Sequence, residues 1–481
     1  MENVFPSIIQ GGMGVGISSW TLAKVVSQAG HLGVVSGVGI DTLLLRLLQL
    51  GDPGGHIARA AAKFPLKDVS QFIFDKYFKA GGIDAKIPFR IPRAPVLVPS
   101  LEDVHLRMFA AFTEVFLAKE NHQGQVGINL LEKLQLTTLA SIYGAMLAGV
   151  NYIIVGAGIP AQYPEIIECL SEGREAEMKI DVEGTPLAGP VVQKLSPKDV
   201  FGLHDVPTIA KPKFLAIVSS VTLANFLERR TQGKVDGYII EGHTAGGHNA
   251  PPRDHSAPVI NGDLQYGPKD EVNLEAFRKI GKPFWLAGSK CSHEGLVSAQ
   301  KEGAKGIQVG SAFALADESG LTRHYKDEII ATWKNSNGAL PVVKTSALAS
   351  PTGFPFKVAT LPNTLTDMNL YTERTRICDM GNLRKPYAQA DGSIGYRCPA
   401  EPVADYVKKG GDAKDCENRA CLCNALFANL GLPQRRKNGG VEDSLVTLGS
   451  NLSFLKYLVP GDKKSYSALD VIHYLLNPLP A

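Results

Sequence analysis

The sequence predicts an α/β fold, a (β/α)8 barrel with a long insertion after its second strand and a C-terminal extension. Eight short apolar runs recur along the chain, most of them end in glycine, and most gaps between them hold an amphipathic helix pattern. Parallel strands buried on both faces should be apolar throughout, as these runs are. A doubly wound open sheet is the second interpretation, because sequence rarely distinguishes a closed sheet from an open one.

The strands and helices alternate in a regular order. The predicted strands lie at 7–12, 32–37, 125–131, 152–158, 214–220, 237–242, 283–288 and 306–313. Helix patterns between them include WTLAKVVSQAG, VTLANFLERR and HEGLVSAQKEGA. A second, shorter insertion at 174–212 has hairpin character around MKIDVEGTPLAG.

This spacing predicts the domain organisation. We expect residues 1–37 and 125–335 to form the barrel, with 38–124 as an inserted helical or lid segment. Beyond about residue 340 the alternation stops and the sequence becomes rich in glycine, proline and turns. Helix signals persist near CLCNALFANLGL and SALDVIHYLL, so 336–481 is expected to form an extension packed on the barrel.

Charge and hydropathy exclude several classes of protein. Lysine and arginine total 50 against 47 acidic residues, with no basic block, so nucleic acid is not an expected partner. The N-terminus has no basic region followed by a long apolar core, which predicts a cytoplasmic location. Residues 134–164 carry no charge, but they are interpreted as a helix followed by a buried strand, not as a membrane span.

The chemically suggestive residues follow the predicted strands. In such a barrel the site lies at the carboxyl ends of the strands. QGGMGVG, GIN, VGAG, AGS and QVGS end the first, third, fourth, seventh and eighth strands, and Asn129 in GIN offers both a donor and an acceptor. Glycines and hydroxyls after strands seven and eight suit a phosphate. Any single glycine is better explained as part of a turn. The sequence contains no P-loop, and GGMGVG fits the dinucleotide-binding motif poorly.

One histidine stands out at the end of the sixth strand. In TAGGHNAP, Ala245, Gly246 and Gly247 precede His248 and remove side-chain bulk beside it. An imidazole there could take a proton or donate a hydrogen bond to an anion. A structural histidine that caps a turn is the alternative, and His243 is the weaker candidate because no cleared space precedes it.

The cysteines are concentrated near the C-terminus. Cys378, Cys398, Cys421 and Cys423 could supply four thiolates to zinc or an iron–sulfur cluster. The spacing is not of the compact C-x2-C type, so buried free cysteines are the preferred interpretation and no metal site is assigned.

Five motifs taken together resemble the nitronate monooxygenase (2-nitropropane dioxygenase-like) family, which is similar to flavin-dependent enoyl-ACP reductases. They are IIQGGMGVGISSWTLAKVVSQAGHLGVVSG, VGINLL, VGAGIP, TAGGHNAP and GAKGIQVGSAF, in the family's order over residues 5–320. GDPGGHIARAAAKFP, ASPTGFPFKVATLP and YRCPAEP look like a longer bacterial subgroup.

This resemblance implies an FMN-binding TIM barrel with His248 as the active-site histidine. The cofactor-binding residues it implies are Gly11, Gly12, Met13, Asn129, Gly156, Gly158, Ser219, Gly246, Gly247, Gly288, Ser289, Gln308, Gly310 and Ser311. Among these, the residues that would hold the ribityl phosphate are Gly288, Ser289, Gln308, Gly310 and Ser311. The chain departs from the commoner family pattern at Thr244, where an acid is usual, and in GSAF, which lacks an arginine beside the phosphate.

The resemblance implies a small-molecule substrate and O2. The leading hypothesis is FMN-dependent oxidation of alkyl nitronates. The alternatives are an NAD(P)H-dependent enoyl-thioester or quinone reductase and, in another class, a non-catalytic barrel that binds a protein. Whether the chain forms a homo-oligomer is left open.

Overall fold

Eight parallel strands form the centre of the molecule, in the sheet order β1-β12-β11-β8-β7-β4-β3-β2. They are β1 (Ile8–Gln10), β2 (Gly33–Ser36), β3 (Val126–Leu131), β4 (Tyr152–Gly156), β7 (Lys213–Val218), β8 (Gly237–Glu241), β11 (Phe284–Ala287) and β12 (Gly306–Val309). The computed structural model describes residues 5–185, 189–437 and 439–478 and confirms all eight predicted strands, within shorter bounds.

The sheet closes into a barrel between β1 and the residue before β2. The Leu32 N–H donates to the Ile8 carbonyl at 3.1 Å, and the Gln10 N–H donates to the Leu32 carbonyl at 3.0 Å. The closed-barrel prediction is therefore confirmed, and the open doubly wound sheet is excluded. Large apolar side chains such as Trp285, Tyr152 and Ile154 fill the interior, so the barrel is a packed core and not a pore.

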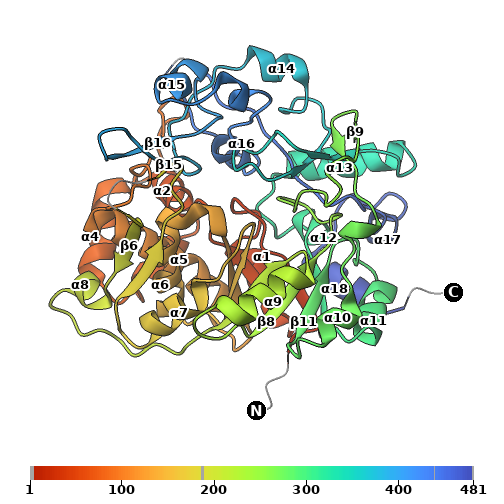
Figure 1. Ribbon diagram of the computed structural model, residues 1–481, viewed down its shortest axis with the longest axis horizontal. Coiled ribbons are helices and arrows are strands. Elements are labelled where there is room, and N and C mark those ends of the chain that lie inside the picture. Colours follow the sequence, from red (N-terminus) through yellow and green to blue (C-terminus); the bar gives the residue numbers. More distant parts are fainter. Residues whose placement is uncertain (1–4, 186–188, 438, 479–481) are drawn as a thin grey trace.

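An outer layer of helices surrounds the barrel (Figure 1). It includes α1 (Trp20–Gln28), α5 (Leu101–Lys119), α6 (Gln135–Leu147), α7 (Tyr163–Ser171), α9 (Val221–Arg230), α10 (Leu274–Arg278) and α11 (His293–Lys301). Although α5 lies inside the predicted insertion, it packs against α1 and α6 as a barrel helix. The extra part of that insertion holds α2 (Ile40–Gln49), α3 (His56–Ala61) and α4 (Lys67–Tyr77).

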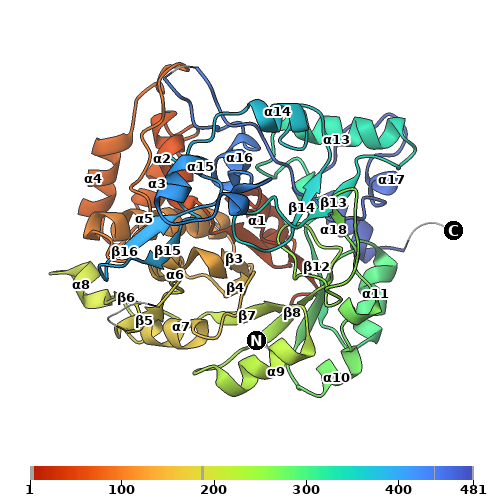
Figure 2. The same cartoon turned by 45° about the horizontal axis from the view of Figure 1, so that its top comes forward.

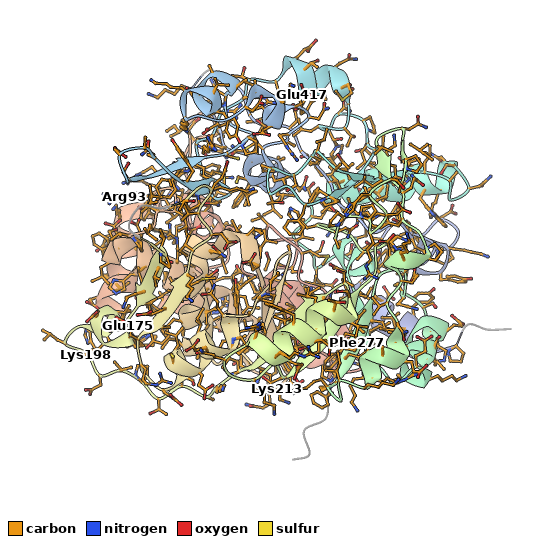
Figure 3. All side chains as sticks on the ribbon, viewed as in Figure 1. Arg93, Glu175, Lys198, Lys213, Phe277 and Glu417 are labelled. Carbon is orange, nitrogen blue, oxygen red and sulfur yellow. The ribbon has the colours of Figure 1, made fainter. Side chains whose placement is uncertain are left out.

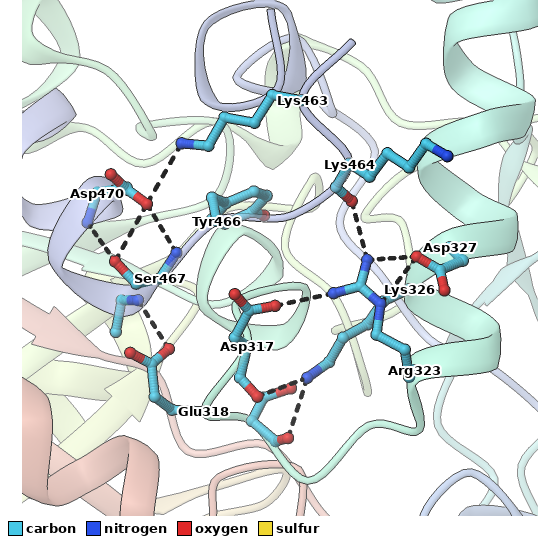
Figure 4. Close-up of polar contacts among 12 residues, drawn as sticks. Asp317, Glu318, Arg323, Lys326, Asp327, Lys463, Lys464, Tyr466, Ser467 and Asp470 are labelled. Carbon is cyan, nitrogen blue, oxygen red and sulfur yellow. Dashed lines mark hydrogen bonds and ion pairs between the residues drawn. The ribbon is translucent and has the colours of Figure 1, made fainter.

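The C-terminal helix completes this layer. Helix α18 (Ala468–Leu476) packs against both α1 and α11, where the eighth barrel helix is needed. Figure 4 shows how the chain before it is attached: Arg323 donates to the Lys464 carbonyl at 2.8 Å, and the Ala468 N–H donates to a Glu318 carboxylate oxygen at 2.8 Å. The end of the extension is therefore part of the barrel wall.

The uncharged stretch 134–164 forms a short helix and a barrel strand. It contains the end of η1 (Glu132–Leu134), then α6 and β4, as the sequence predicts. Helix α6 has 13 residues. In the described part of the chain, no helix has the length and apolar character that crossing a membrane requires.

Two hairpins occupy the loops between strands. The predicted hairpin is confirmed by the antiparallel pair β5 (Ala176–Lys179) and β6 (Val192–Leu195), while 186–188 lie outside the described residues. Helix α8 (Pro197–Phe201) follows it. The loop after β8 holds the small hairpin of β9 (Val259–Ile260) and β10 (Asp263–Leu264), and then η2 (Pro268–Asp270).

The rest of the extension lies over the carboxyl ends of the strands (Figure 2). Its elements are β13 (Val343–Ser346), β14 (Phe356–Ala359), α14 (Met368–Glu373), β15 (Lys385–Ala388), β16 (Ile394–Arg397), α15 (Val403–Lys408), η3 (Ala413–Cys416), α16 (Leu422–Ala428) and α17 (Leu455–Leu458). Helices α12 (Ser311–Ala314) and α13 (Arg323–Asn335) precede it, between β12 and residue 336. Figure 3 places Glu417 of this segment at the end of the molecule opposite Lys213, the first residue of β7.

One arginine joins the insertion to the extension. Arg46 on α2 is fully buried, and its guanidinium lies 4.2 Å from the ring centroid of Phe427 on α16. It also donates to the Leu432 carbonyl and to the Gln434 side chain, the latter at 3.2 Å. Because a buried charge is costly unless hydrogen-bonded, these contacts fix the extension relative to α2.

Replacing this arginine should loosen the extension. We expect Arg46→Met to lower the free energy of unfolding by about 2–4 kcal/mol, because it leaves buried acceptors without a donor. Urea denaturation measures the change. Arg59→Met is the matched control, since the Arg59 side chain is 42% exposed and pairs with Glu120 at the surface. Equal losses for the two variants would contradict the assignment.

Candidate functional site

A cavity of about 240 Å³ lies over the carboxyl ends of the barrel strands. Each of the eight strands contributes to its wall, either with its last residues or with the loop that follows it. The wall runs from Gly11 after β1 to Ser311 after β12. The volume is close to the lower end of the roughly 300–1,000 Å³ that is usual for small-molecule sites. The cavity therefore lies where a (β/α)8 barrel carries its chemistry.

The C-terminal extension forms the roof of this cavity. The roof is mostly apolar, with Phe356 from β14 and Phe427 from α16 among its side chains. Val446 and Leu448 continue the apolar surface on a segment without regular structure. The enclosed space is suited to a flat apolar group with polar atoms along one edge.

The structure brings most of the predicted site residues together. Those that line the cavity are Gly11, Gly12, Met13, Asn129, Gly156, Gly246, Gly247, His248, Gly288, Ser289, Gln308, Gly310 and Ser311. Gly158 and Ser219 do not line it. A Cβ atom on Gly158 would fall 2.0 Å from a Glu132 carboxylate oxygen, so this glycine serves chain packing. Ser219 faces a separate small cavity on the other side of Glu241.

Several of these glycines are required by the fold itself. A Cβ atom on Gly12 would lie 2.1 Å from the Cβ atom of Asn129, and one on Gly246 would lie 2.9 Å from the Leu448 backbone. The gap beside Gly246 is therefore filled by the C-terminal segment and not left for a ligand. Gly247 has φ of +82°, which favours glycine for its backbone conformation.

The wall after β11 and β12 combines an unpartnered polar atom with a positive charge. The Gln308 side-chain oxygen is buried and has no hydrogen-bond partner among the described residues. Ser289 has φ of +52°, an uncommon backbone conformation for a residue with a side chain. Lys290 also lines the cavity, and it brings a positive charge to the wall where the sequence lacks the family's arginine.

Contacts from the extension fix the position of His248. The residues on either side of it bond to the chain at 355–357: the Lys357 N–H donates to the Gly247 carbonyl and the Asn249 N–H donates to the Pro355 carbonyl, both at 2.9 Å. The imidazole packs edge-on against Phe356 with 4.8 Å between ring centroids. Its Nε2 atom shares a 2.8 Å hydrogen bond with the Ser350 hydroxyl. Burial lowers the pKa of His248 to about 4, so the ring is neutral at neutral pH.

The loop that carries His248 is also bound to the segment 447–450. The Gly247 N–H donates to the Thr447 hydroxyl at 2.9 Å, and the Ser450 N–H donates to the Thr244 carbonyl at 2.9 Å. From the same segment, the Gly449 N–H donates to the Ser311 hydroxyl at 2.7 Å. The segment thus links the histidine loop to the loop after β12.

Sequence reasoning missed a carboxyl group in the cavity wall. Glu241 is the last residue of β8 and lines the cavity, and burial raises its pKa to about 8. A charged residue at the end of an otherwise apolar strand was the signal that could have revealed it. Ser350 and Lys290 were also missed, and Ser350 lies 102 positions from His248 in sequence, which left no local signal.

The comparisons with known proteins agree with the motifs. No family model matches the chain. A protein of Staphylococcus saprophyticus named probable nitronate monooxygenase is 29% identical over 136 residues, which is 27% of this chain and 36% of that protein. The aligned part therefore spans about a third of that relative. The chain resembles the nitronate monooxygenase family. This match confirms the recognition made from the motifs.

Two solved structures align with most of this chain but share little sequence with it. FabK from Thermotoga maritima has a TM-score of 0.49 at 14% identity, over 98% of this chain and 92% of that one. Nitroalkane oxidase from Streptomyces ansochromogenes has a TM-score of 0.47 at 12% identity, over 98% and 95%.

The raised pKa of Glu241 predicts a pH-dependent stability. Its proton is bound more tightly in the folded protein, so its stabilising effect is complete below pH 4.5 and is lost as the pH rises to about 8. Relative to the wild type, Glu241→Gln should therefore gain stability progressively from pH 5 to pH 9. Urea denaturation across this range, with Glu275→Gln as an exposed-carboxylate control, checks the trend. A difference that does not vary with pH would contradict it.

Proposed function

We propose that the chain is an FMN-dependent oxidoreductase that oxidises alkyl nitronates with O2. The observation that carries the proposal is the roofed cavity at the strand ends, where His248 lies within one wall and Gln308 within another. The sequence match to a protein named probable nitronate monooxygenase supports the substrate class. Bound FMN would supply the redox chemistry, and the protein would hold and shield it.

The residues present fit this cofactor. The unpartnered Gln308 oxygen offers an acceptor inside the cavity, and the apolar roof would cover a flat ring. Lys290 would balance the phosphate charge in place of the arginine that GSAF lacks. Asn129 and the loop at Gly11 and Gly12 would lie along the ring, as the family resemblance implies.

The environment of His248 favours hydrogen bonding over proton removal. A pKa of about 4 makes the imidazole a poor base for a neutral nitroalkane at pH 7. A neutral ring can still donate one N–H to an anionic nitronate. If the Ser350 hydroxyl donates to Nε2, the ring proton is on Nδ1, and the serine then selects the tautomer. We therefore infer that the substrate enters as the nitronate.

A substitution at Gly310 tests where the cofactor lies without disturbing the fold. Gly310 has φ of −104°, and a Cβ atom there would meet only the Met13 sulfur, at 3.7 Å. Gly310→Ala should therefore keep its stability within about 0.5 kcal/mol of the wild type. It should nevertheless weaken FMN binding about tenfold, because the methyl group occupies the space of the phosphate.

Fluorescence titration of the apoprotein with FMN measures that affinity. Gly267→Ala is the control, since nothing lies within 4 Å of a Cβ atom there and Gly267 is outside the cavity wall. Unchanged affinity in a folded Gly310→Ala protein would contradict the phosphate placement.

His248 should affect turnover more than cofactor binding. We expect His248→Asn to retain FMN and to lower kcat/KM for a nitronate by about 100-fold, because a positioned donor is lost. His243→Asn is the matched control, as His243 stacks on Tyr266 beside a different cavity. Oxygen consumption with a preformed alkyl nitronate measures the rates. Wild-type turnover in His248→Asn would refute the role.

Anaerobic titration of the FMN-loaded protein tests the reaction class. Bleaching of the flavin by nitronate alone is expected. Bleaching by NADH or NADPH and not by nitronate would favour the enoyl-thioester or quinone reductase instead. A protein that takes up no FMN would favour the non-catalytic interpretation.

A further inference from the structure

A second cavity, of about 290 Å³, adjoins the cavity over the strand ends. Its wall includes the first turn of α6, the segment that follows β5 and the start of β15. Leu134, Asn382 and Leu383 line both cavities, so one layer of side chains stands between them. The second cavity therefore begins at the wall of the first.

A chain of hydrogen bonds leads from His248 to the second cavity. The Nε2 atom of His248 lies 2.8 Å from the Ser350 hydroxyl oxygen, which lies 2.8 Å from the hydroxyl oxygen of Thr352. Thr352 lines the second cavity. Ser350 is fully buried, and Arg419 donates to its carbonyl at 2.7 Å, so this chain is held in place. The wall of the second cavity is thus two hydrogen bonds away from the imidazole.

The far end of the second cavity is open to solvent. Asp181 and Glu183 both line it, and their side chains are 72% and 48% exposed. Lys385, at the start of β15, lines it too and is exposed. Leu134, at the junction with the main cavity, is buried. The cavity therefore leads from an apolar junction to a polar rim at the surface.

The charges nearer the junction are already paired or hydrogen-bonded. The Lys133 ammonium lies 3.3 Å from an Asp181 carboxylate oxygen, and Glu183 pairs with Arg397. Arg384 donates to two backbone carbonyls. An occupant that carried a further charge would compete with these contacts, because desolvating a charge is costly unless it gains a partner. The lining therefore favours an uncharged chain.

We propose that the second cavity binds the far end of the substrate's alkyl chain and makes the protein selective for nitronates with long, uncharged chains. The nitronate group would lie beside His248, and the chain would pass between Leu134 and Leu383 toward Leu136 and Ile180. The second cavity supplies binding energy remote from the reacting group, and no covalent step occurs there. This inference rests on the proposed function, since it assumes that His248 holds the head of the substrate.

Unreactive analogues test the second cavity independently of turnover. Alkyl carboxylates resemble nitronates, since both are planar anions with two oxygens. Calorimetric titration of the FMN-loaded protein measures their affinity. From acetate through butyrate and hexanoate to octanoate, the affinity should rise about two- to fourfold for each added carbon, because each methylene leaves water for an apolar wall. The kcat/KM values for the nitronates of nitroethane, nitrobutane and nitrohexane should rise in parallel.

Narrowing the junction should remove this dependence on chain length. Asn382 lies in a turn, is half-buried and lines both cavities, so the indole ring of Asn382→Trp would obstruct the junction. Octanoate affinity should fall about tenfold or more, whereas acetate affinity should change little. Leu383→Trp is a second variant at the same junction. Asn335→Trp is the matched control, since Asn335 is exposed on α13 and lines neither cavity.

The outcomes separate this inference from the proposed function. An affinity that does not rise with carboxylate length in the wild type would overturn the inference, even if nitroethane nitronate is turned over. A rising series without turnover of any nitronate would contradict the proposed function and leave the second cavity as a chain-binding site. Circular dichroism identifies the variants that fold. If folded Asn382→Trp and Leu383→Trp keep the chain-length dependence of Asn335→Trp, the inference is also overturned.

Discussion

The pairing of the loop after β8 with the C-terminal extension is the constraint on which the site depends. One side of this loop forms backbone hydrogen bonds with β14, and the other is bound to the segment 447–450. His248 is thereby held by Phe356 and Ser350, neither of which belongs to the barrel. Without β14 and the segment 447–450, the cavity would lose part of its roof, and the imidazole would lose its position.

The barrel could be predicted from the sequence because its signals are local. Each buried strand is an apolar run of a few residues, and helices such as α9 at Val221–Arg230 show their periodicity within one segment. Parallel strands place their carboxyl ends on one face, so Asn129, Gln308 and His248 could be assigned to a common site before any contact was known. The cavity wall that they form follows from this topology.

The roof could not be predicted in the same way, because it depends on contacts between distant segments. Ser350 reaches His248 across 102 positions, and Arg46 reaches Gln434 across 388. The sequence suggested that Gly246 leaves space for a ligand. In the structure the Leu448 backbone occupies that space, so the glycine is required by chain packing. Glu241 was overlooked because it reads as the end of a strand. The cysteines give a further example, because one small cavity is lined by Cys378, Cys398, Cys421 and Cys423, and their spacing in the sequence does not indicate this.

The central claim is that the cavity over the strand ends holds a flavin between the barrel and its roof. A crystal structure of the protein after FMN uptake tests this most directly. The account predicts electron density for the ring between Asn129 and the roof, with the phosphate beside Gln308 and Lys290. Density for FMN outside this cavity, or a cavity occupied by repacked roof side chains in the FMN-loaded protein, would contradict it.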